Sequence, residues 1–377
     1  MIGEHFSLIL LPTLRCDAAC DYCFEKKAGA DMSIDQLKSL ISKVLDYMEQ
    51  NEAKALSIHW QGGEVMMMSP QWFARAGDVI DRAADSRNVN VRNYIQSNMI
   101  GYSKEWNPII AEMFDNSVGS SMDYPNRHRK LPGGSAADFN AVWIRNVRQA
   151  QDAGIHIGVI ALPDAETLQR GAENLYSYFT EELNITDFQI NTPFAGGPAD
   201  ASKTGYPLDT ERLTQFLTEL ADIWAERGYH QGVRVGPFDE LIEYFRGEDA
   251  VLPCIWKANC ADEFVCIDPQ GNIAQCDCWV ASYPQFHFGN IFKNDSLAEL
   301  LRDNPVRHKF LGRPGVLIQK EECPECDYLA ICHGGCPVRA YTTYGDLHTK
   351  DPYCETYKTV FNQAELISAC LARENCS

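Results

Sequence analysis

The chain has 377 residues, of which 45% are hydrophobic and 23% are charged, a composition that supports a large core and roughly two domains. Its 52 acidic and 33 basic residues give a formal charge of −19, which disfavours nucleic acid and anionic membranes as partners. We find neither a secretory signal nor an apolar run of about 18–20 residues, and we expect a cytoplasmic protein. In a reducing compartment, 15 cysteines indicate metal binding rather than disulfides.

The first two-thirds of the chain alternates short apolar runs with amphipathic stretches. The apolar runs predict strands at residues 6–11, 55–60, 91–96, 117–123, 155–162 and 186–191. The amphipathic stretches predict helices at residues 33–50, 70–84, 104–114, 136–154 and 165–183, and a further helix at 209–228 after a loop at 192–207. Such alternation predicts a parallel sheet covered by helices, in six β/α units.

The pattern of the sequence changes at about residue 251, where the helical periodicity of apolar residues fades. Twelve of the 15 cysteines lie between Cys254 and Cys376. We therefore predict a boundary near 235–250, with a first domain at 1–240 and a cysteine-rich second domain, ending in a helix, at 241–377.

Three cysteines, Cys16, Cys20 and Cys23, follow the first predicted strand with the spacing C-x3-C-x2-C. In a parallel β/α barrel, active sites form from the loops after the strands. A structural zinc site needs four ligands, whereas a [4Fe–4S] cluster held by three thiolates keeps one iron open. The spacing therefore predicts an iron–sulfur cluster with a free coordination position.

The segment "CDAACDYC" resembles the motif of the radical S-adenosylmethionine (SAM) superfamily, C-x3-C-x-aromatic-C, with Tyr22 as the aromatic residue. The resemblance implies a partial (β/α)6 barrel, in agreement with the six predicted units. It also implies that the open iron binds SAM, and that SAM is cleaved to methionine and a 5′-deoxyadenosyl radical that abstracts a substrate hydrogen.

The same resemblance implies further SAM-binding residues in the loops after the strands. "QGGE" (61–64) stands where the family has a Gly-Gly-Glu segment that meets the SAM amino group. Arg145 on the predicted helix at 136–154, or Arg148 in its place, is expected to pair with the SAM carboxylate. The other expected SAM-binding residues are Gly62, Gly63, Glu64, Gln96, Asn98, Ser121 and Asp123.

The cysteines of the second domain resemble the SPASM domain, which carries auxiliary clusters in some radical SAM enzymes. The resemblance implies one [4Fe–4S] cluster on Cys254, Cys260, Cys276 and Cys336, and another on Cys323, Cys326, Cys332 and Cys354. Together with the first cluster this makes three. We expect ordinary thiols at Cys266, Cys278, Cys370 and Cys376, although Cys278 could compete with Cys276. A pair of zinc sites is the alternative.

Asp277 directly follows the predicted ligand Cys276. The chain resembles anaerobic sulfatase-maturating enzymes in length and cysteine spacing, and in those enzymes an aspartate at this place is thought to deprotonate the substrate. The resemblance therefore implies that Asp277 is a general base.

The sequence leaves several reactions open. The favoured hypothesis is the oxidative modification of a peptide or protein side chain, most of all cross-linking in a natural-product precursor peptide. "QSNM" (96–99) and "SMDYP" (121–125) depart from the sulfatase-maturase segments Gln-Thr-Asn-Gly and Ser-Met-Asp-Gly-Pro, so conversion of Ser or Cys to formylglycine is an alternative. A small-molecule dehydrogenase and a non-enzymatic electron carrier are the others. The expected partners are a peptide or protein substrate and an electron donor such as flavodoxin or ferredoxin.

Overall fold

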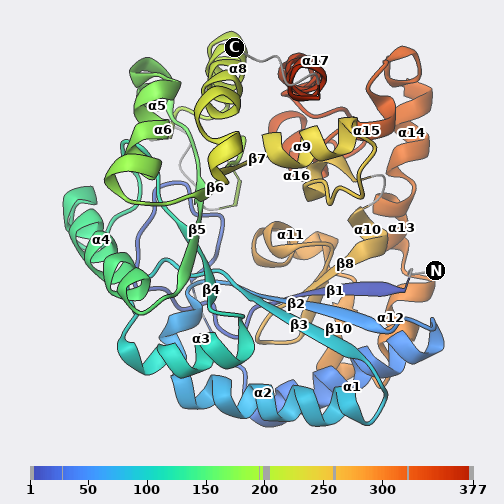
Figure 1. Cartoon of the computed structure of the whole chain (residues 1–377). Helices are drawn as coiled ribbons and strands as arrows, with labels where there is room; N and C mark the ends of the chain where they lie inside the picture. The colour runs from blue at the N-terminus through green and yellow to red at the C-terminus, as the bar shows by residue number, and fades with distance from the viewer. Residues whose placement is uncertain are drawn as a thin grey trace.

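The computed structural model describes residues 4–27, 29–194, 196–197, 204–257, 260–320 and 322–372, without the side chain of residue 318. A curved layer of strands is covered on its outer side by helices (Figure 1). Much of the cysteine-rich region lies on the other side of the strands, but its helix at Leu297–Arg302 packs beside the helix at Ile34–Gln50 on the outer side. Within the described ranges, no helix is both long and apolar enough to cross a bilayer. The predicted loop at 192–207 lies partly outside these ranges.

The strands of the first region form two parallel sheets. In order along the sheets, they are β1 (His5–Leu10), β2 (Ala55–Trp60) and β3 (Asn90–Ile95), then β4 (Ser117–Ser121), β5 (His156–Ala161), β6 (Asp187–Ile190) and β7 (Arg234–Gly236). A single parallel bridge between Gln96 and Gly119 joins β3 to β4. The two sheets thus continue each other as an open parallel barrel, which confirms the predicted fold class.

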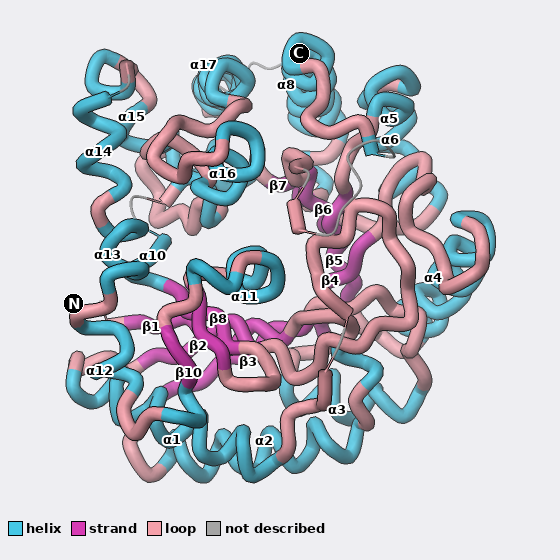
Figure 2. The backbone as a smooth tube through the Cα atoms, turned by 180° about the vertical axis from the view of Figure 1, so that it is seen from behind, coloured by secondary structure: helices cyan, strands magenta, loops and turns pink. Residues whose placement is uncertain are grey.

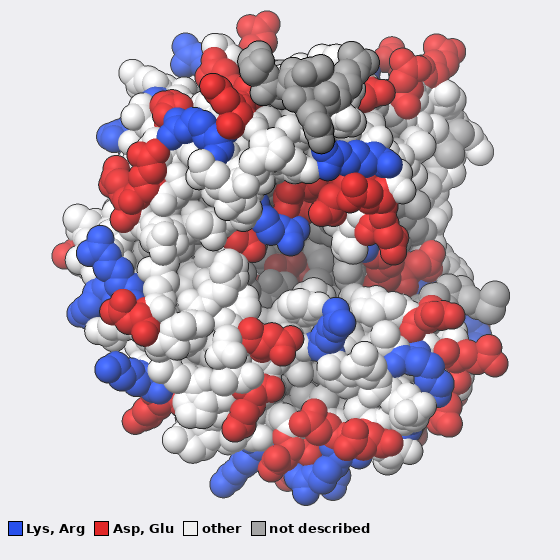
Figure 3. All heavy atoms as spheres, in the orientation of Figure 1, with Lys and Arg blue, Asp and Glu red and all other residues white. Residues whose placement is uncertain are grey.

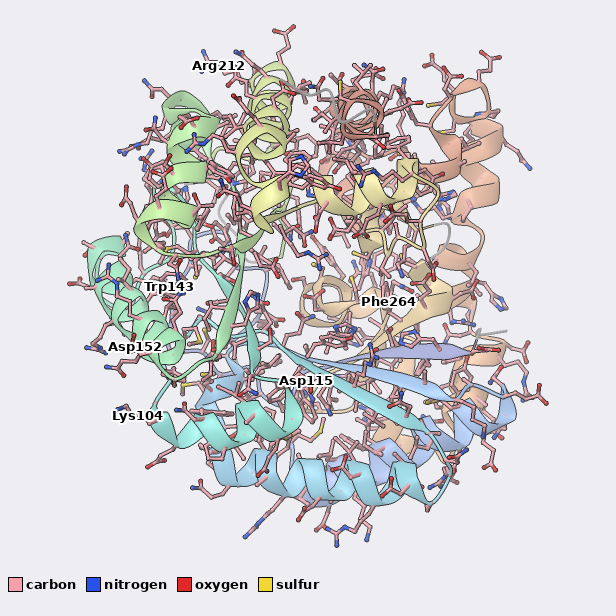
Figure 4. The ribbon with its side chains drawn as sticks, viewed as in Figure 1. Lys104, Asp115, Trp143, Asp152, Arg212 and Phe264 are labelled. Carbon is pink, nitrogen blue, oxygen red and sulfur yellow. The ribbon has the colours of Figure 1, made fainter. Side chains whose placement is uncertain are left out.

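Amphipathic helices cover the outer face of this barrel (Figure 1). They are α1 (Ile34–Gln50), α2 (Pro70–Asp85), α3 (Asn107–Met113), α4 (Ala136–Asp152), α5 (Ala165–Arg170), α6 (Ala172–Ser177), α8 (Thr210–Arg227) and α9 (Phe238–Phe245). Ser33 caps α1, and its hydroxyl accepts a hydrogen bond from the Gln36 backbone. Trp143 on α4 points to the sheet, where its indole donates to Ser120 Oγ at 3.0 Å (Figure 4).

The six predicted strands are present, with ends shifted by at most two residues. The predicted helix at 165–183 is interrupted at Gly171, which has a φ of 87° and stands between α5 and α6. β7 was not predicted, because a strand of three residues carries too little periodicity to detect.

The cysteine-rich region continues the sheet of the barrel. β8 (Phe264–Ile267) pairs in parallel with β1, with Ser7 opposite Phe264 and Leu10 opposite Ile267. β9 (Asn272–Ala274) returns antiparallel to β8, as the predicted hairpin requires, and β10 (Gly289–Asn290) follows it in the sheet. One sheet therefore contains strands from both sides of residue 240. The domain boundary predicted there stays a prediction.

Helices dominate the rest of this region, contrary to the fading periodicity expected after residue 251 (Figure 2). They are α10 (Cys260–Glu263), α11 (Asp277–Ser282), α12 (Leu297–Arg302), α13 (Pro305–Leu311), α14 (Arg313–Lys320), α15 (Leu329–Cys332), α16 (Pro337–Tyr344) and α17 (Cys354–Leu371). Most are one or two turns long, too short for a period of 3.6 residues to show in the sequence. The expected C-terminal helix is α17, which packs against α8 and α9.

The loops that follow β1 and β2 pack backbone to backbone. Gly63 N donates to Thr13 O at 3.1 Å, and Glu64 N donates to Arg15 O at 2.8 Å. A Cβ on Gly63 would lie 2.3 Å from Arg15 O. Gly62 has a φ of 129°, and a Cβ there would lie 2.6 Å from Thr13 O. Both positions require glycine so that "QGGE" can support the segment just before Cys16.

A chain that ends at residue 250 should fail to fold. It would leave β1 without its partner β8 and expose an unpaired, apolar sheet edge, which favours aggregation. We expect the truncated chain to be insoluble under conditions in which the full chain is soluble. A soluble fragment with a single cooperative thermal transition would contradict this prediction.

Gly63→Ala should displace the segment before Cys16, because the added methyl group meets backbone atoms that cannot rotate away. We expect a loss of about 1–3 kcal/mol in stability, together with lower iron content after anaerobic reconstitution. Gly315→Ala is the matched control, because Gly315 lies exposed on α14 with no atom within 4 Å of the added Cβ. This change should keep the iron content and raise the free energy of unfolding by about 0.5–1 kcal/mol. Equal iron content in the two variants would contradict the prediction.

Candidate active site

The first cysteine group, Cys16, Cys20 and Cys23, lies in the loop after β1. Two backbone hydrogen bonds fix this loop, from Ala19 N to Lys130 O at 2.7 Å and from Asp21 N to His128 O at 3.0 Å. Burial raises the pKa of all three thiols, that of Cys16 to about 12. Buried thiols become thiolates when a metal supplies positive charge, so this donor set fits a metal cluster.

A second group, Cys254, Cys260, Cys276 and Cys336, is assembled from four separate segments. Burial raises the pKa of Cys260, and the sulfurs of the other three raise it further. Cys254 likewise lies near Cys336 and Cys276. The structure thus brings together the four residues expected at one auxiliary cluster, and an all-thiol set of four suits [4Fe–4S] or zinc.

The third group, Cys323, Cys326, Cys332 and Cys354, lines one hollow, which Lys350 and Lys358 also line. Burial, followed by the neighbouring Cys354, Asp351 and Cys323, raises the pKa of Cys332 to about 12. This is the set expected at the other auxiliary cluster. Its donor chemistry is the same as that of the second group.

Two buried arginines fix the segments around the second and third groups. Arg313 donates to four carbonyl oxygens, those of Gly334, Gly335, Leu347 and Thr349, at 2.7–3.0 Å. Arg339 lies beside Asp351, whose Oδ2 accepts from Cys336 N at 2.9 Å. The guanidinium groups therefore set the positions of the cysteine backbone without being ligands themselves.

The polar residues expected after β3 and β4 meet at the barrel mouth. Gln96 Nε2 donates to Ser121 Oγ at 2.9 Å. Asn98 Nδ2 donates to Asp17 Oδ1 at 2.8 Å and lies 3.8 Å from Cys16 Sγ. The structure therefore brings Asn98 next to Cys16 of the first cysteine group and joins Gln96 to Ser121.

Glu64 ends the "QGGE" segment, and its expected role in binding SAM stays a prediction. It is buried, and burial raises its pKa to about 7. Its Oε1 accepts from Met66 N and from the hydroxyl of Ser97, and its Oε2 accepts from Asn98 N at 2.6 Å. Glu64 therefore ties the "QGGE" loop to the loop after β3, which the sequence did not reveal.

The guanidinium beside the first cysteine group belongs to Arg129, not to Arg145. Arg145 and Arg148 are exposed on α4, and Arg145 Nε donates to the neighbouring Asn146. Arg129 is buried, donates to both oxygens of Asp123, and lies over the ring of Tyr22 at 5.3 Å. Tyr22 also donates its hydroxyl hydrogen to Asp123 at 2.6 Å.

Asp277 begins α11, directly after Cys276. Its Oδ2 accepts from Gln61 Nε2 at 3.2 Å, and its Oδ1 accepts from Cys278 N at 2.9 Å. Gln61 precedes the glycines of the loop after β2, so this contact joins the auxiliary region to the barrel mouth. Potential ligand atoms of Cys276, Asp277 and Cys278 lie within 4.8 Å of one another, so the competition from Cys278 stays a prediction. Cys376 lies outside the described residues.

Glu25, two residues after Cys23, is a site residue that the sequence analysis missed. It is buried, and burial followed by the carboxylates of Asp277 and Asp268 raises its pKa to about 8. Among the described residues, its Oε2 has no hydrogen-bond partner. Near the place of α11, the molecular face is hollowed, with acidic side chains along part of the rim (Figures 1 and 3). The position of Glu25 beside a cluster motif was the only signal in the sequence.

Comparison with known proteins gives relatives over nearly the whole chain. No protein-family model matches. A cysteine-type anaerobic sulfatase-maturating enzyme of Clostridium perfringens is 26% identical over 371 residues, which cover 95% of this chain and 96% of the relative. The alignment therefore spans nearly the whole length of both proteins.

Two solved structures share the fold. The sulfatase-maturating enzyme anSMEcpe with bound AdoMet and Kp18Cys peptide matches with a TM-score of 0.79 and 23% identity, over 98% of this chain and 99% of that one. SuiB of Streptococcus suis bound to precursor peptide SuiA matches with a TM-score of 0.58 and 17% identity, over 94% and 77% of the chains. The solved structures show that this chain shares their fold. The cysteine motif and the similarity to the Clostridium perfringens relative make the chain a radical SAM enzyme, a peptide-modifying oxidoreductase that resembles the anaerobic sulfatase-maturating enzymes.

Proposed function

We propose that this enzyme oxidises the β-carbon of a cysteine or serine in a protein substrate to give formylglycine. The observation that carries the proposal is the similarity to a cysteine-type sulfatase-maturating enzyme over 95% of the chain. The position of Asp277 supports it, since this acid directly follows Cys276 and is held by Gln61 at the barrel mouth.

The three cysteine groups would hold three [4Fe–4S] clusters, and the group of three would leave one iron open for SAM. When bound, the open cluster and SAM supply a 5′-deoxyadenosyl radical that removes a hydrogen atom from the substrate β-carbon. Gln96, Asn98 and Ser121 line the same mouth and would orient SAM there. A flavodoxin or ferredoxin of the cytoplasm would donate the electron that starts the reaction.

Asp277 would act as the base of the second half of the reaction. The target side chain loses a hydrogen atom from carbon, a proton from its thiol or hydroxyl, and one electron, which an auxiliary cluster held by the second or third cysteine group would accept. Asp277 Oδ2 accepts the proton, while the hydrogen bond from Gln61 Nε2 holds this carboxylate in place. With a cysteine target, water then replaces sulfur and hydrogen sulfide leaves. With serine, the aldehyde forms directly.

Cross-linking of a precursor peptide, the reaction that the sequence analysis favoured, is the second candidate. It is supported by the shared fold of SuiB and by the departures at "QSNM" and "SMDYP". The first candidate has the stronger support, because the sulfatase-maturating relative matches along nearly its whole length. Solved neighbours with bound peptides support a peptide substrate over a small molecule.

Incubation of the reconstituted enzyme with SAM, a reductant and a sulfatase-derived cysteine peptide should give a peptide aldehyde. Mass spectrometry should show exchange of sulfur and hydrogen for oxygen, and the product should react with a hydrazine reagent. Loss of a hydrogen pair without a new aldehyde, in cysteine and serine peptides alike, would contradict formylglycine formation and favour cross-linking.

Asp277→Asn should separate SAM cleavage from product formation. Because the amide cannot take the proton, we expect 5′-deoxyadenosine to form while aldehyde yield falls about 100-fold or more. Asp152→Asn is the matched control, since Asp152 is exposed on α4 (Figure 4) and far from the described site. Aldehyde yields that are equal in the two variants would show that Asp277 is not the base.

A further inference from the structure

Three side chains of β1, β2 and β3 form a row on the inner face of the barrel. Trp60 of β2 packs against Phe73 of α2 on the outer face. His59 precedes Trp60, so its side chain points to the opposite face, into the barrel. The parallel register sets Ile9 of β1 and Tyr94 of β3 beside His59. The row therefore runs Ile9, His59, Tyr94 across the sheet.

The two rings of this row stack on each other. Their centroids lie 5.0 Å apart, and their planes make an angle of 14°. Burial lowers the pKa of His59, which keeps the imidazole neutral near pH 7. Tyr94 is 47% exposed, although it stands within a strand of the barrel sheet. We name this pair, His59 and Tyr94, the aromatic shelf.

The barrel in front of the aromatic shelf is not filled. Packed parallel barrels fill their interior with bulky, branched side chains. Here Gly119 of β4 is paired with Gly158 of β5. Both face inward, because Ser120, which follows Gly119, accepts a hydrogen bond from Trp143 on the outer side. The molecular face in Figure 3 is hollowed between the places that β3 and α9 take in Figure 1. The exposed ring of Tyr94 therefore borders open space inside the barrel.

The residues next to the aromatic shelf limit what can bind there. Arg92 lies on the same face of β3, two residues before Tyr94. Lys257 lies over the ring of Phe264 on β8, and its ammonium is paired with Glu263. The positive charge of Arg92 disfavours a lysine or arginine on the shelf. A flat, uncharged ring would instead gain stacking energy beyond that of the area it buries, so an aromatic side chain fits best.

The aromatic shelf continues into the candidate active site. Gln61 follows His59 by two residues, and Gln96 follows Tyr94 by two, so each pair shares a side of its strand. Two residues of a strand span about 7 Å. Gln61 holds Asp277, the proposed base. Since consecutive Cα atoms of a peptide are about 3.8 Å apart, a residue one or two positions from the target reaches the shelf.

We propose that the aromatic shelf is a subsite that binds an aromatic side chain of the peptide substrate, one or two residues away from the residue that is oxidised. The subsite rests on the proposed function, since it presumes a peptide whose target lies at Asp277. It would make the inner face of β2 and β3 a determinant of which peptides bind.

The test measures peptide binding without turnover. Holoenzyme is reconstituted anaerobically and kept with SAM but without reductant. Fluorescence anisotropy then follows labelled cysteine peptides that carry phenylalanine, alanine, glutamate or lysine at each of the two positions on either side of the target. At one position, we expect the phenylalanine peptide to bind wild-type enzyme about tenfold or more tightly than the alanine peptide.

Two substitutions of Tyr94 assign this preference to the shelf. Tyr94→Val keeps a residue that favours strands but removes the ring, so the preference for phenylalanine should vanish. Tyr94→Phe keeps the ring and should retain the preference. Tyr344→Val is the matched control, because Tyr344 is 57% exposed on α16, and it should also retain the preference. Iron content and thermal unfolding show whether each variant is folded.

A photoreactive peptide tests the subsite without any substitution in the enzyme. With benzoylphenylalanine at the preferred position, irradiation should link the peptide to β2 or β3 of the wild-type enzyme, as mapped by mass spectrometry. This measurement decides if Tyr94→Val loses iron. Links confined to other segments would overturn the proposal.

The binding series can overturn the proposal in three further ways. Wild-type enzyme shows no position-specific preference for phenylalanine, glutamate or lysine binds as tightly as phenylalanine, or Tyr94→Val retains the preference. Aldehyde formation without an aromatic preference would refute the subsite and leave the proposed function intact. An aromatic preference without any aldehyde on adding reductant would sustain the subsite and refute formylglycine formation instead.

Discussion

The parallel pairing of β8 with β1 is the contact on which the site depends. β1 leads into the loop of Cys16, Cys20 and Cys23, and the β8–β9 hairpin leads into Cys276 and Asp277. Because β1 and β8 run in the same direction, the loop after β1 and the β8–β9 turn emerge at the same edge of the sheet, and β9 then returns antiparallel to β8 and leads to Cys276 and Asp277. A segment some 250 residues away in sequence is thereby fixed next to the first cysteine group, with Gln61 bridging the gap to Asp277.

Burial of ionisable groups is the second constraint that shapes the site. Thiols, carboxylates and three guanidinium groups are held in the interior, where each is stabilised only by a partner of suitable charge or hydrogen bonding. Arg129 with Asp123, and Arg339 with Asp351, satisfy each other. Burial raises the pKa of thiols in each of the three cysteine groups, and Glu25 Oε2 is among the buried side-chain atoms of the described residues that have no hydrogen-bond partner.

Much of the fold could be predicted from the sequence, because long amphipathic helices and apolar strands repeat with a clear period. The cysteine groups could be predicted because the spacing of the cysteines resembles the motifs of radical SAM enzymes and of the SPASM domain. Arg129, Ser97 and Glu25 were not, because their importance comes from burial by segments distant in sequence. Gly62 and Gly63 lie against the backbone of residues 13–15, a contact that their expected role in SAM binding did not predict, and that role stays a prediction. Arg145 is exposed on α4 in the structure, and its expected pairing with the SAM carboxylate stays a prediction.

Mössbauer spectroscopy of the anaerobically reconstituted, iron-57-labelled protein tests the central claim most directly, that the chain gathers three cysteine groups around one reactive site. The account predicts about twelve irons per chain, all in [4Fe–4S] clusters, and a change on adding SAM that is confined to a single iron. An iron content near four, bound zinc in place of the auxiliary iron, or a spectrum indifferent to SAM would contradict it.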